Sequence, residues 1–235
     1  MEQNPIQKSR TRGFMLNGGF GKKTRQVEEF YNKFFGRNYD RHMRKTGHYR
    51  VMDAFLDLAV NRIPGAPAKI LDPACGTGHA IRHLLSKRQD LSFVANDLSS
   101  TMLSIAKHKL NGYAPEKIEF TQHDVHNLPI PNGTFTAILL GYGMHWFVDK
   151  AGAVDELYRV LEDHGRLISI EEWPLLVTPT KYSAKFGEKL VETVTPINME
   201  EMSSVFHKAG FTTIECEVSP IDSKHDMHYR LYAKR

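Results

Sequence analysis

The stretch Ile70-Leu-Asp-Pro-Ala-Cys-Gly-Thr-Gly-His79 is the part of this sequence that points most directly to a fold. An apolar strand ends at Asp72, and the loop that follows contains Gly76 and Gly78. Because glycine has no side chain, the backbone there can pass close to a ligand and present its amides at the start of the next helix. Ile81 stands where a dinucleotide-binding G-x-G-x-x-G motif needs its third glycine, so the loop alone is weak evidence.

Strands and helices alternate on both sides of this loop. Alternation of this kind predicts a mostly parallel sheet with helices on both faces. The last two strands have no helix between them, so they should form an antiparallel hairpin at one edge. The expected strands are 68–71, 91–95, 118–121, 135–140, 166–170, 211–218 and 227–233. The expected helices are 27–35, a segment with Val51, Phe55, Leu58, Ala59 and Ile63 on one face, 79–88, 99–110, 150–162, and a last one capped by Asn198.

Two acidic residues follow the next two strands at informative positions. Asp97 ends the second strand, 19 residues beyond Gly78, where a carboxylate can accept both hydroxyls of a ribose. Asp124 follows the third strand, where a carboxylate can accept from an adenine amino group. Each acid has a purely structural alternative: Asp97 as a cap for the helix at Ser99, and Asp124 as a solvated turn residue. Because strand ends share one sheet edge, we favour a shared ligand.

With these residues in place, the chain resembles the class I S-adenosylmethionine-dependent methyltransferases over about residues 30–235. Within that superfamily it looks most like the ubiquinone/menaquinone-biosynthesis branch and its small-molecule relatives. The motifs that carry the resemblance are Asp72-Pro-Ala-Cys-Gly-Thr-Gly78, Asn96-Asp-Leu-Ser-Ser-Thr-Met102, Asp124 ahead of Leu128-Pro129, and Glu156-Leu-Tyr-Arg-Val-Leu-Glu-Asp-His-Gly165.

The resemblance implies one α/β domain of the Rossmann-like class I methyltransferase fold. Its sheet would have seven mostly parallel strands and an antiparallel C-terminal hairpin. We therefore expect a basic flexible arm at 1–25, N-terminal helices that form a substrate lid at 26–66, and the cofactor-binding core at 67–235. The cofactor would be S-adenosyl-L-methionine, with S-adenosyl-L-homocysteine as its product. The residues that the resemblance places around it are Tyr39, Asp72, Ala74, Gly76, Gly78, Asp97, Leu98, Met102, Asp124, Val125 and Gly141.

The acceptor side is expected next to the fourth strand, in Gly141-Tyr-Gly-Met-His-Trp146. The quinone enzymes usually carry an Arg-Asn-containing sequence here, and this departure argues against a quinone acceptor. Methyl transfer needs a positioned acceptor, and a base only if the acceptor must lose a proton. His145 is the first candidate base, with Tyr142 as a positioning residue; the alternative is that His145 and Trp146 only pack the next helix. Phe35, Trp146 and Glu171 are the candidates for the substrate pocket.

Metal and thiol chemistry are not expected. His79 and His83 are four residues apart on a predicted helix, but no third ligand follows at a recognisable spacing. Cys75 and Cys216 are the only cysteines, which is too few for a disulfide framework and fits a reducing, cytoplasmic location. No apolar run approaches the roughly 20 residues that span a bilayer.

The formal charge of +4 is concentrated at the N-terminus, where residues 1–50 carry 12 Lys and Arg against 4 Asp and Glu. Such a segment can contact phosphates or an anionic membrane surface, or it can simply be solvated. The leading hypothesis is methyl transfer to a small aromatic or lipophilic acceptor. An RNA or protein methyltransferase that uses the basic arm, and a non-catalytic S-adenosylmethionine-binding regulatory protein, stay as alternatives. We do not expect nucleic acid as a partner, peripheral membrane contact stays open, and the oligomeric state is not predicted.

Overall fold

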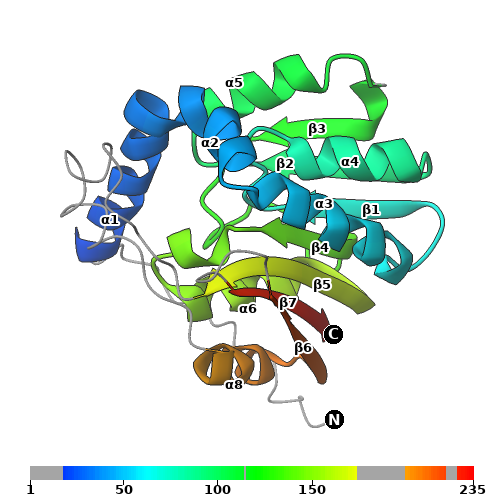
Figure 1. The fold of residues 1–235 in the computed structure, drawn as a ribbon. Coiled ribbons are helices and arrows are strands. Elements are labelled where there is room, and N and C mark those ends of the chain that lie inside the picture. Colours follow the sequence, from blue (N-terminus) through cyan, green and yellow to red (C-terminus); the bar gives the residue numbers. More distant parts are fainter. Residues whose placement is uncertain (1–17, 114, 174–198, 221–226) are drawn as a thin grey trace, which may run out of the picture.

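The computed structural model describes residues 18–113, 115–173, 199–220 and 227–235 (Figure 1). Within these ranges one seven-stranded sheet has the order β3-β2-β1-β4-β5-β7-β6. β1 to β5 are parallel, and β7 pairs antiparallel with both β5 and β6. The expected fold class, including the C-terminal hairpin, is confirmed. The strands are β1 (Ala68–Asp72), β2 (Leu91–Asn96), β3 (Ile118–Thr121), β4 (Phe135–Gly141), β5 (Leu161–Trp173), β6 (Thr213–Pro220) and β7 (Met227–Lys234).

Helices cover both faces of the sheet. Side chains of α3, α4 and α5 join one buried cluster, and those of α6 and α8 join a second cluster on the opposite face. The α-helices are α1 (Gly18–Glu29), α2 (Tyr39–Lys45), α3 (His48–Ala59), α4 (His79–Lys87), α5 (Ser100–Lys109), α6 (Lys150–Val160) and α8 (Met199–Ala209). The short helical turns are η1 (Phe30–Phe35, a π-helix), η2 (Gly36–Asn38), η3 (Val60–Arg62), η4 (Pro115–Lys117) and η5 (Met144–Trp146).

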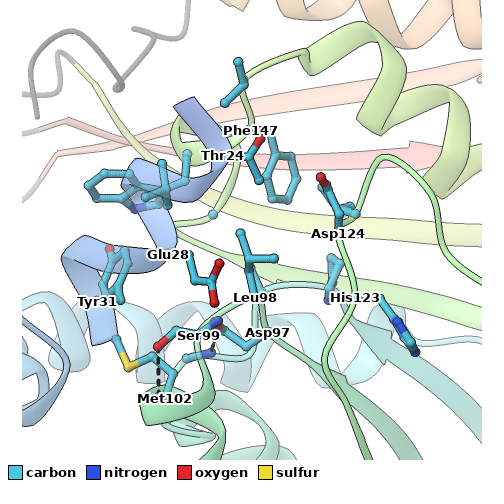
Figure 2. Close-up of a pocket in the computed structure, with 18 of the residues that line it drawn as sticks. Thr24, Glu28, Tyr31, Asp97, Leu98, Ser99, Met102, His123, Asp124 and Phe147 are labelled. Atoms are coloured by element: carbon cyan, nitrogen blue, oxygen red, sulfur yellow. Dashed lines mark hydrogen bonds between the residues drawn. The ribbon is translucent and has the colours of Figure 1, made fainter. Parts of the chain in front are cut away.

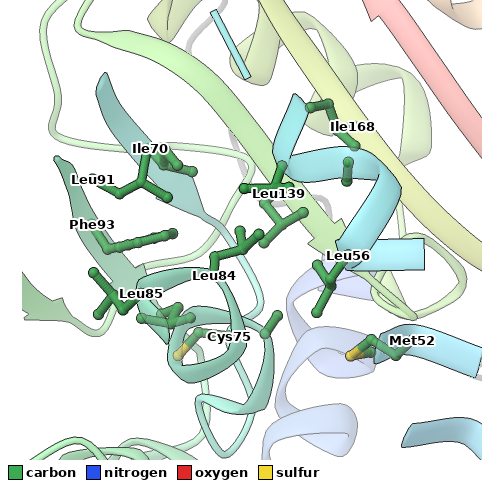
Figure 3. Packing of buried hydrophobic residues seen from close by; sticks show 14 of the residues in the cluster. Met52, Leu56, Ile70, Cys75, Leu84, Leu85, Leu91, Phe93, Leu139 and Ile168 are labelled. Carbon is green, nitrogen blue, oxygen red and sulfur yellow. The ribbon is translucent and has the colours of Figure 1, made fainter. Parts of the chain in front are cut away.

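The two buried clusters follow from the alternation of side chains along each central strand. In β1, Ile70 belongs to the first cluster and Leu71 to the second, and in β4 the same holds for Leu139 and Ile138. Figure 3 shows the first cluster, where Leu84 of α4 packs between the strands and the N-terminal helices. A strand buried on both sides needs a continuous apolar run, which is why these strands could be recognised in the sequence.

The strand order places a topological switch between β1 and β4. The chain leaves β1 toward β2 and β3, and then returns to pair β4 with the other side of β1. The loops after these two strands therefore diverge, and parallel α/β sheets bind ligands in the crevice that forms there. The glycine loop follows β1 directly, so the fold brings it to this crevice.

The N-terminal helices differ from the sequence expectation in two respects. α1 already begins at Gly18, within the stretch 1–25 that was expected to be a flexible arm. Residues 1–17 of that arm lie outside the described residues, as does Asn198, the predicted cap of the last helix. The expected face of α3 was only partly right: Phe55, Ala59 and Ile63 are buried, but Leu58 is 51% exposed and Val51 is half-buried. The buried face of the helix consists of Tyr49, Met52, Phe55, Leu56 and Ala59. Among the described residues, no helix has the length and apolar character that crossing a membrane requires.

Candidate functional site

A pocket with about 750 Å³ of empty space, part of it open to solvent, lies at the carboxyl ends of β1 to β4. Figure 2 shows the loops after the strands on one side and α1 on the other. The lining residues are Thr24, Val27, Glu28, Tyr31, Tyr39, Pro73, Ala74, Gly76, Asp97, Leu98, Ser99, Met102, His123, Asp124, Val125, His126, Gly141, Tyr142, Gly143, Trp146, Phe147 and Val148.

The loop after β1 requires glycine at two positions. Gly76 has φ +52° and Gly78 has φ +75°, which is the left-handed region where side chains are strained. A Cβ on Gly78 would also stand 2.8 Å from Cδ1 of Leu110. Gly78 is the N-cap of α4, so the loop turns sharply into that helix. The turn leaves Gly76 and Ala74 at the pocket wall.

Asp97 is held at the end of β2 by two backbone amides. Its Oδ2 accepts from Gly76 N at 2.8 Å, and its Oδ1 accepts from Ser99 N at 2.8 Å. Burial raises the pKa of Asp97 to about 6, although both amides favour the charged form and limit the rise. The carboxylate therefore has a fixed direction at the pocket wall, and each oxygen has lone pairs left for donors from a ligand.

Asp72 lies beneath the pocket rather than in its wall. It is 3% exposed, and its Oδ1 has no hydrogen-bond partner among the described residues. Burial, with a smaller contribution from the charge of Asp97, raises the pKa of Asp72 to about 8, although a hydrogen bond from the Ala74 backbone opposes the shift. A buried acceptor without a partner fits a cationic donor, such as the amino group of an amino-acid ligand.

Asp124 is already engaged by His126 on the β3 side of the pocket. Its Oδ1 accepts from His126 N at 3.1 Å and lies 2.5 Å from His126 Nδ1. Burial acts to raise the pKa of Asp124, but the two hydrogen bonds from His126 outweigh it and lower the pKa. Asp124 is therefore an anion with one oxygen occupied, and its position suits contact with an adenine edge.

Tyr39 reaches the pocket because the residue next to it is fixed. Asp40 Oδ1 accepts from Tyr49 OH at 2.5 Å and from Thr77 Oγ1 at 2.6 Å, and Asp40 Oδ2 accepts from Lys109 Nζ at 2.8 Å. Burial acts to raise the pKa of Asp40, but these three partners lower it overall. One carboxylate thus joins α2, α3, α5 and the glycine loop.

Aromatic rings form the wall opposite the strand ends. The Trp146 ring lies 5.2 Å from that of Tyr31 and 5.9 Å from that of Phe30, measured between centroids. Phe35 packs edge-on against Tyr39 at 5.7 Å but is not in the pocket lining. Such a wall can hold a flat apolar molecule, and ring faces also attract cations.

His145 and Glu171 lie together behind this wall. His145 is 6% exposed, its Nδ1 lies 3.4 Å from Glu171 Oε2, and neither residue lines the pocket. Glu171 Oε1 accepts from Gly143 N at 3.3 Å, from Met144 N at 3.1 Å and from Ser169 Oγ at 3.0 Å. The pair therefore supports the loop after β4 from below.

The end of β4 is closely covered by the N-terminal helices. A Cβ on Gly141 would stand 2.9 Å from Cε of Met52, so the α3 thioether already fills this space. Tyr142 follows with φ +57°, a conformation that few residues with side chains adopt. Its ring packs edge-on against His48 at 5.3 Å. Tyr142 itself lines the pocket.

The structure brings most of the residues singled out in the sequence to one place. Of the eleven expected cofactor residues, Asp72 and Gly78 support the pocket from outside and the others line it. The sequence analysis missed the contribution of α1 and its continuation η1, whose pocket residues are Thr24, Val27, Glu28 and Tyr31. Val27, Glu28 and Tyr31 follow Thr24 by three, four and seven positions. This spacing places all four residues on one face of a helix, and it could have been recognised in the sequence.

The paired histidines of α4 contact carboxylates of α3. His79 Nε2 lies 2.7 Å from Asp53 Oδ1, and His83 Nε2 lies 2.9 Å from Asp57 Oδ1. Within the parts of the chain that the structure describes, no three His, Cys, Asp or Glu side chains are grouped as ligands of a metal ion. These pairs join the N-terminal helices to the core.

The chain is similar in sequence to known methyltransferases. A family model described as a methyltransferase domain matches residues 70–165. The chain is 37% identical over 116 residues to the demethylmenaquinone methyltransferase of Thermus thermophilus, covering 49% of this chain and 51% of that protein. It is 36% identical over 142 residues to the enzyme of the same name from Thermotoga maritima, covering 60% and 58%. The chain thus spans little more than half the length of these curated relatives.

Solved structures share the fold at lower identity. One is the Haemonchus contortus phosphoethanolamine N-methyltransferase 2 in complex with S-adenosyl-L-methionine. It superposes with a TM-score of 0.62 at 15% identity, covering 76% of this chain and 51% of that chain. An identity this low shows the fold and leaves the choice of substrate open.

Proposed function

This chain belongs to the class I S-adenosylmethionine-dependent methyltransferases, and we propose that it transfers a methyl group to a small aromatic, lipophilic acceptor. The observation that carries the proposal is a single pocket lined by the ends of four parallel strands and by an aromatic wall that includes Trp146 and Tyr31. A quinol of the demethylmenaquinone type is the first acceptor to test, because the relatives are named for it, although the sequence Gly141-Tyr-Gly-Met-His-Trp146 differs from the one usual in the quinone enzymes.

The chain's own residues fit the cofactor at three points. The Asp97 carboxylate, held by Gly76 N and Ser99 N, is placed to accept from ribose hydroxyls. The buried Oδ1 of Asp72 is an acceptor for the amino group of the methionine part. Asp124 and the apolar Val125 and Met102 suit the polar edge and the faces of adenine. We therefore assign these residues to cofactor binding.

When bound, S-adenosylmethionine would supply an electrophilic methyl group: the acceptor bonds to the methyl carbon in line with the carbon–sulfur bond, which breaks and leaves S-adenosylhomocysteine. The protein's part is positioning, which can contribute several kcal/mol to lowering a barrier of this kind. Trp146 and Tyr142 would orient the acceptor beside Gly141, and the packed N-terminal helices would exclude water. His145 stands behind this wall next to Glu171, so we assign it to the support of the β4 loop rather than to proton transfer.

Calorimetry with S-adenosylhomocysteine tests the cofactor assignment, and incubation with labelled S-adenosylmethionine and reduced quinols tests the transfer. We expect micromolar binding and label in the organic phase. Asp97→Ala should weaken the binding of both cofactor forms, whereas substitution of the exposed Asn61 should leave it unchanged. Tight cofactor binding without transfer to any small aromatic acceptor would contradict the proposed acceptor class.

A further inference from the structure

The pocket has a roof that comes from outside the cofactor-binding core. Thr24, Val27, Glu28 and Tyr31 line the pocket from one face of α1 and its π-helical continuation η1. Figure 2 shows Glu28 reaching from this helix toward the side where Leu98 and Ser99 lie. This face covers the part of the pocket that contains Asp97 and Ser99. A molecule in that part of the pocket is therefore enclosed by α1.

One side chain of the roof is fastened to the first turn of α5. Asn32 Oδ1 accepts from Ser99 Oγ at 2.7 Å, from Thr101 N at 3.1 Å and from Ser100 Oγ at 3.4 Å. In return, Thr101 Oγ1 donates to the backbone oxygen of Asn32 at 3.2 Å. These contacts join residues almost 70 positions apart in the chain, and they connect a helix of the roof to the core.

Asn32 acts as a cap for α5 that is supplied by another helix. The first amides of a helix have no acceptor within it, so each needs an outside partner. The N-cap Ser99 uses its own Oγ to accept from Met102 N at 3.1 Å. The amide of Thr101 is satisfied by Asn32 instead. Opening the roof would therefore leave α5 with an unsatisfied amide, which has a cost in free energy.

The same turn of α5 carries the residues that face the cofactor pocket. Asp97 and Leu98 precede the cap, and Met102 lies in the first turn. Asn32 Nδ2 also donates to Glu28 Oε1 at 3.4 Å. Through Asn32, the pocket-lining residue Glu28 is therefore connected to the first turn of α5. The position of the roof and the position of the nucleoside contacts thus depend on one amide side chain.

Close packing next to Asn32 reinforces this junction. A Cβ on Gly36 would stand 2.5 Å from the Tyr31 backbone oxygen and 3.0 Å from Cγ2 of Thr101. Glycine at this position therefore lets η2 approach α5 closely. The junction is also where the helix adopts the π form in η1, which is rare and occurs frequently at functional sites.

We propose that Asn32 is a positioning residue that latches α1 over the cofactor pocket, so that release of this latch controls the exchange of S-adenosylmethionine and its demethylated product. The inference rests on the proposed function, because it concerns the same pocket. A closed roof must open for each exchange, so the latch sets the dissociation rate more than the association rate. Hydrogen bonds to the α5 cap would be remade when the roof closes.

The test is the dissociation rate of S-adenosylhomocysteine, measured by stopped-flow competition with the fluorescence of Trp146 as the signal, in a Trp173→Phe background that removes the second tryptophan of the chain. Asn32→Ala should raise this rate about tenfold, because it removes every hydrogen bond made by the side chain. Asn32→Asp should give an intermediate rate. Its carboxylate still accepts from Ser99 Oγ and Thr101 N, but it loses the donor to Glu28 Oε1 and repels that carboxylate. Asn111→Ala, at the exposed end of α5, is the matched control.

Gly36→Ala gives a second route to the same result, because it separates the roof from α5 without touching Asn32. Faster dissociation in Asn32→Ala and Gly36→Ala, with Asn32→Asp intermediate and Asn111→Ala close to wild type, supports the latch. Unchanged dissociation in Asn32→Ala overturns the latch while the cofactor assignment stands. If the wild-type chain binds no S-adenosylhomocysteine, the proposed function fails and the latch fails with it.

Discussion

Asp97 at the end of β2 and Gly76 in the loop after β1 are joined by a 2.8 Å hydrogen bond from the glycine amide to Oδ2 of the carboxylate. This bond connects the two elements that the cofactor would contact at its centre. It fixes the direction of the carboxylate before any ligand binds. The pocket is therefore largely preorganised on the core side.

Asp97→Asn tests this arrangement with little change in volume. An amide has one acceptor oxygen, so it cannot accept from both Gly76 N and Ser99 N and still receive two ribose hydroxyls. We expect the affinity for S-adenosylhomocysteine to fall about 10- to 100-fold, which corresponds to the loss of about 1.5–3 kcal/mol in charge-assisted hydrogen bonding. Calorimetry measures the loss, and an unchanged affinity would contradict the ribose assignment.

Binding of the cofactor should release a proton near neutral pH. The pKa of Asp72 is raised to about 8 by burial, so this carboxyl group is mostly protonated at pH 7 in the free protein. An ammonium group next to Oδ1 favours the charged form, so about one proton should leave per site. Calorimetry in two buffers with different ionisation enthalpies measures it, and Asp72→Asn should abolish it. Binding without proton release would place the ammonium elsewhere.

The same two carboxyl groups should make the ligand-free protein less stable as the pH rises. The folded-state pKa values of Asp97 and Asp72 are about 6 and about 8, above the value near 4 in an unfolded chain. Between about pH 4 and 8 the folded protein thus binds more protons than the unfolded chain, so the free energy of unfolding falls with pH. Thermal melts should show this fall, and it should be smaller in Asp72→Asn.

Asp40 should contribute stability with the opposite pH dependence. Its pKa is lowered because hydrogen bonds from Lys109, Thr77 and Tyr49 outweigh its burial. The folded state thus favours the carboxylate, and this contribution is present above about pH 4 and lost as the pH falls through the folded-state pKa. Asp40→Asn should lower the free energy of unfolding by about 1–3 kcal/mol at pH 7. The gap to wild type should narrow below pH 4; a constant gap would argue against an ionised Asp40.

Glu171 should act as an anchor of the loop after β4. Glu171→Ala leaves the amides of Gly143 and Met144 without their acceptor in a buried place, which costs about 1–3 kcal/mol. Glu171→Gln keeps one oxygen for these amides and should recover most of the stability. Denaturant unfolding measures both variants. If the two variants are equally stable but equally inactive, Glu171 contacts the acceptor instead.

The sheet and the glycine loop could be predicted because their signals are local. A strand buried on both faces has an uninterrupted apolar run, as in Ile138 to Leu140, and left-handed turns favour glycine, as at Gly76 and Gly78. The acids after β2 and β3 could be placed together because parallel strands end at one sheet edge. These inferences needed no knowledge of side-chain packing.

The N-terminal half of the site could not be predicted in the same way. The face of α1 that lines the pocket contains the polar residues Thr24 and Glu28. Helix prediction depends on apolar residues that recur along one face, and polar residues at these positions interrupt that pattern. In α3, the predicted face correctly included Phe55 but also Leu58, whereas the helix buries Met52 and leaves Leu58 exposed. Apolar residues occur around much of the circumference of α3. Which face is buried is therefore decided by the elements that pack against the helix.

The direction of His145 was also beyond the reach of the sequence. His145 and Trp146 are neighbours in the short 3₁₀ turn η5, where successive side chains point about 120° apart. The structure turns Trp146 to the pocket and His145 to Glu171. Proximity to a strand end identifies the loop, but not which of its side chains faces the ligand.

Met52 packs beside Gly141 at the end of β4, next to the pocket but outside its lining. Its Cε occupies the space that a Cβ on Gly141 would need, and a thioether on an unbranched chain changes shape at little cost. A change of the Met52 rotamer therefore frees space beside Gly141, which lines the pocket, with no movement of the strand end. We expect broad acceptor tolerance as a consequence, and exchange of Met52 for a rigid branched residue should narrow the repertoire without altering cofactor affinity.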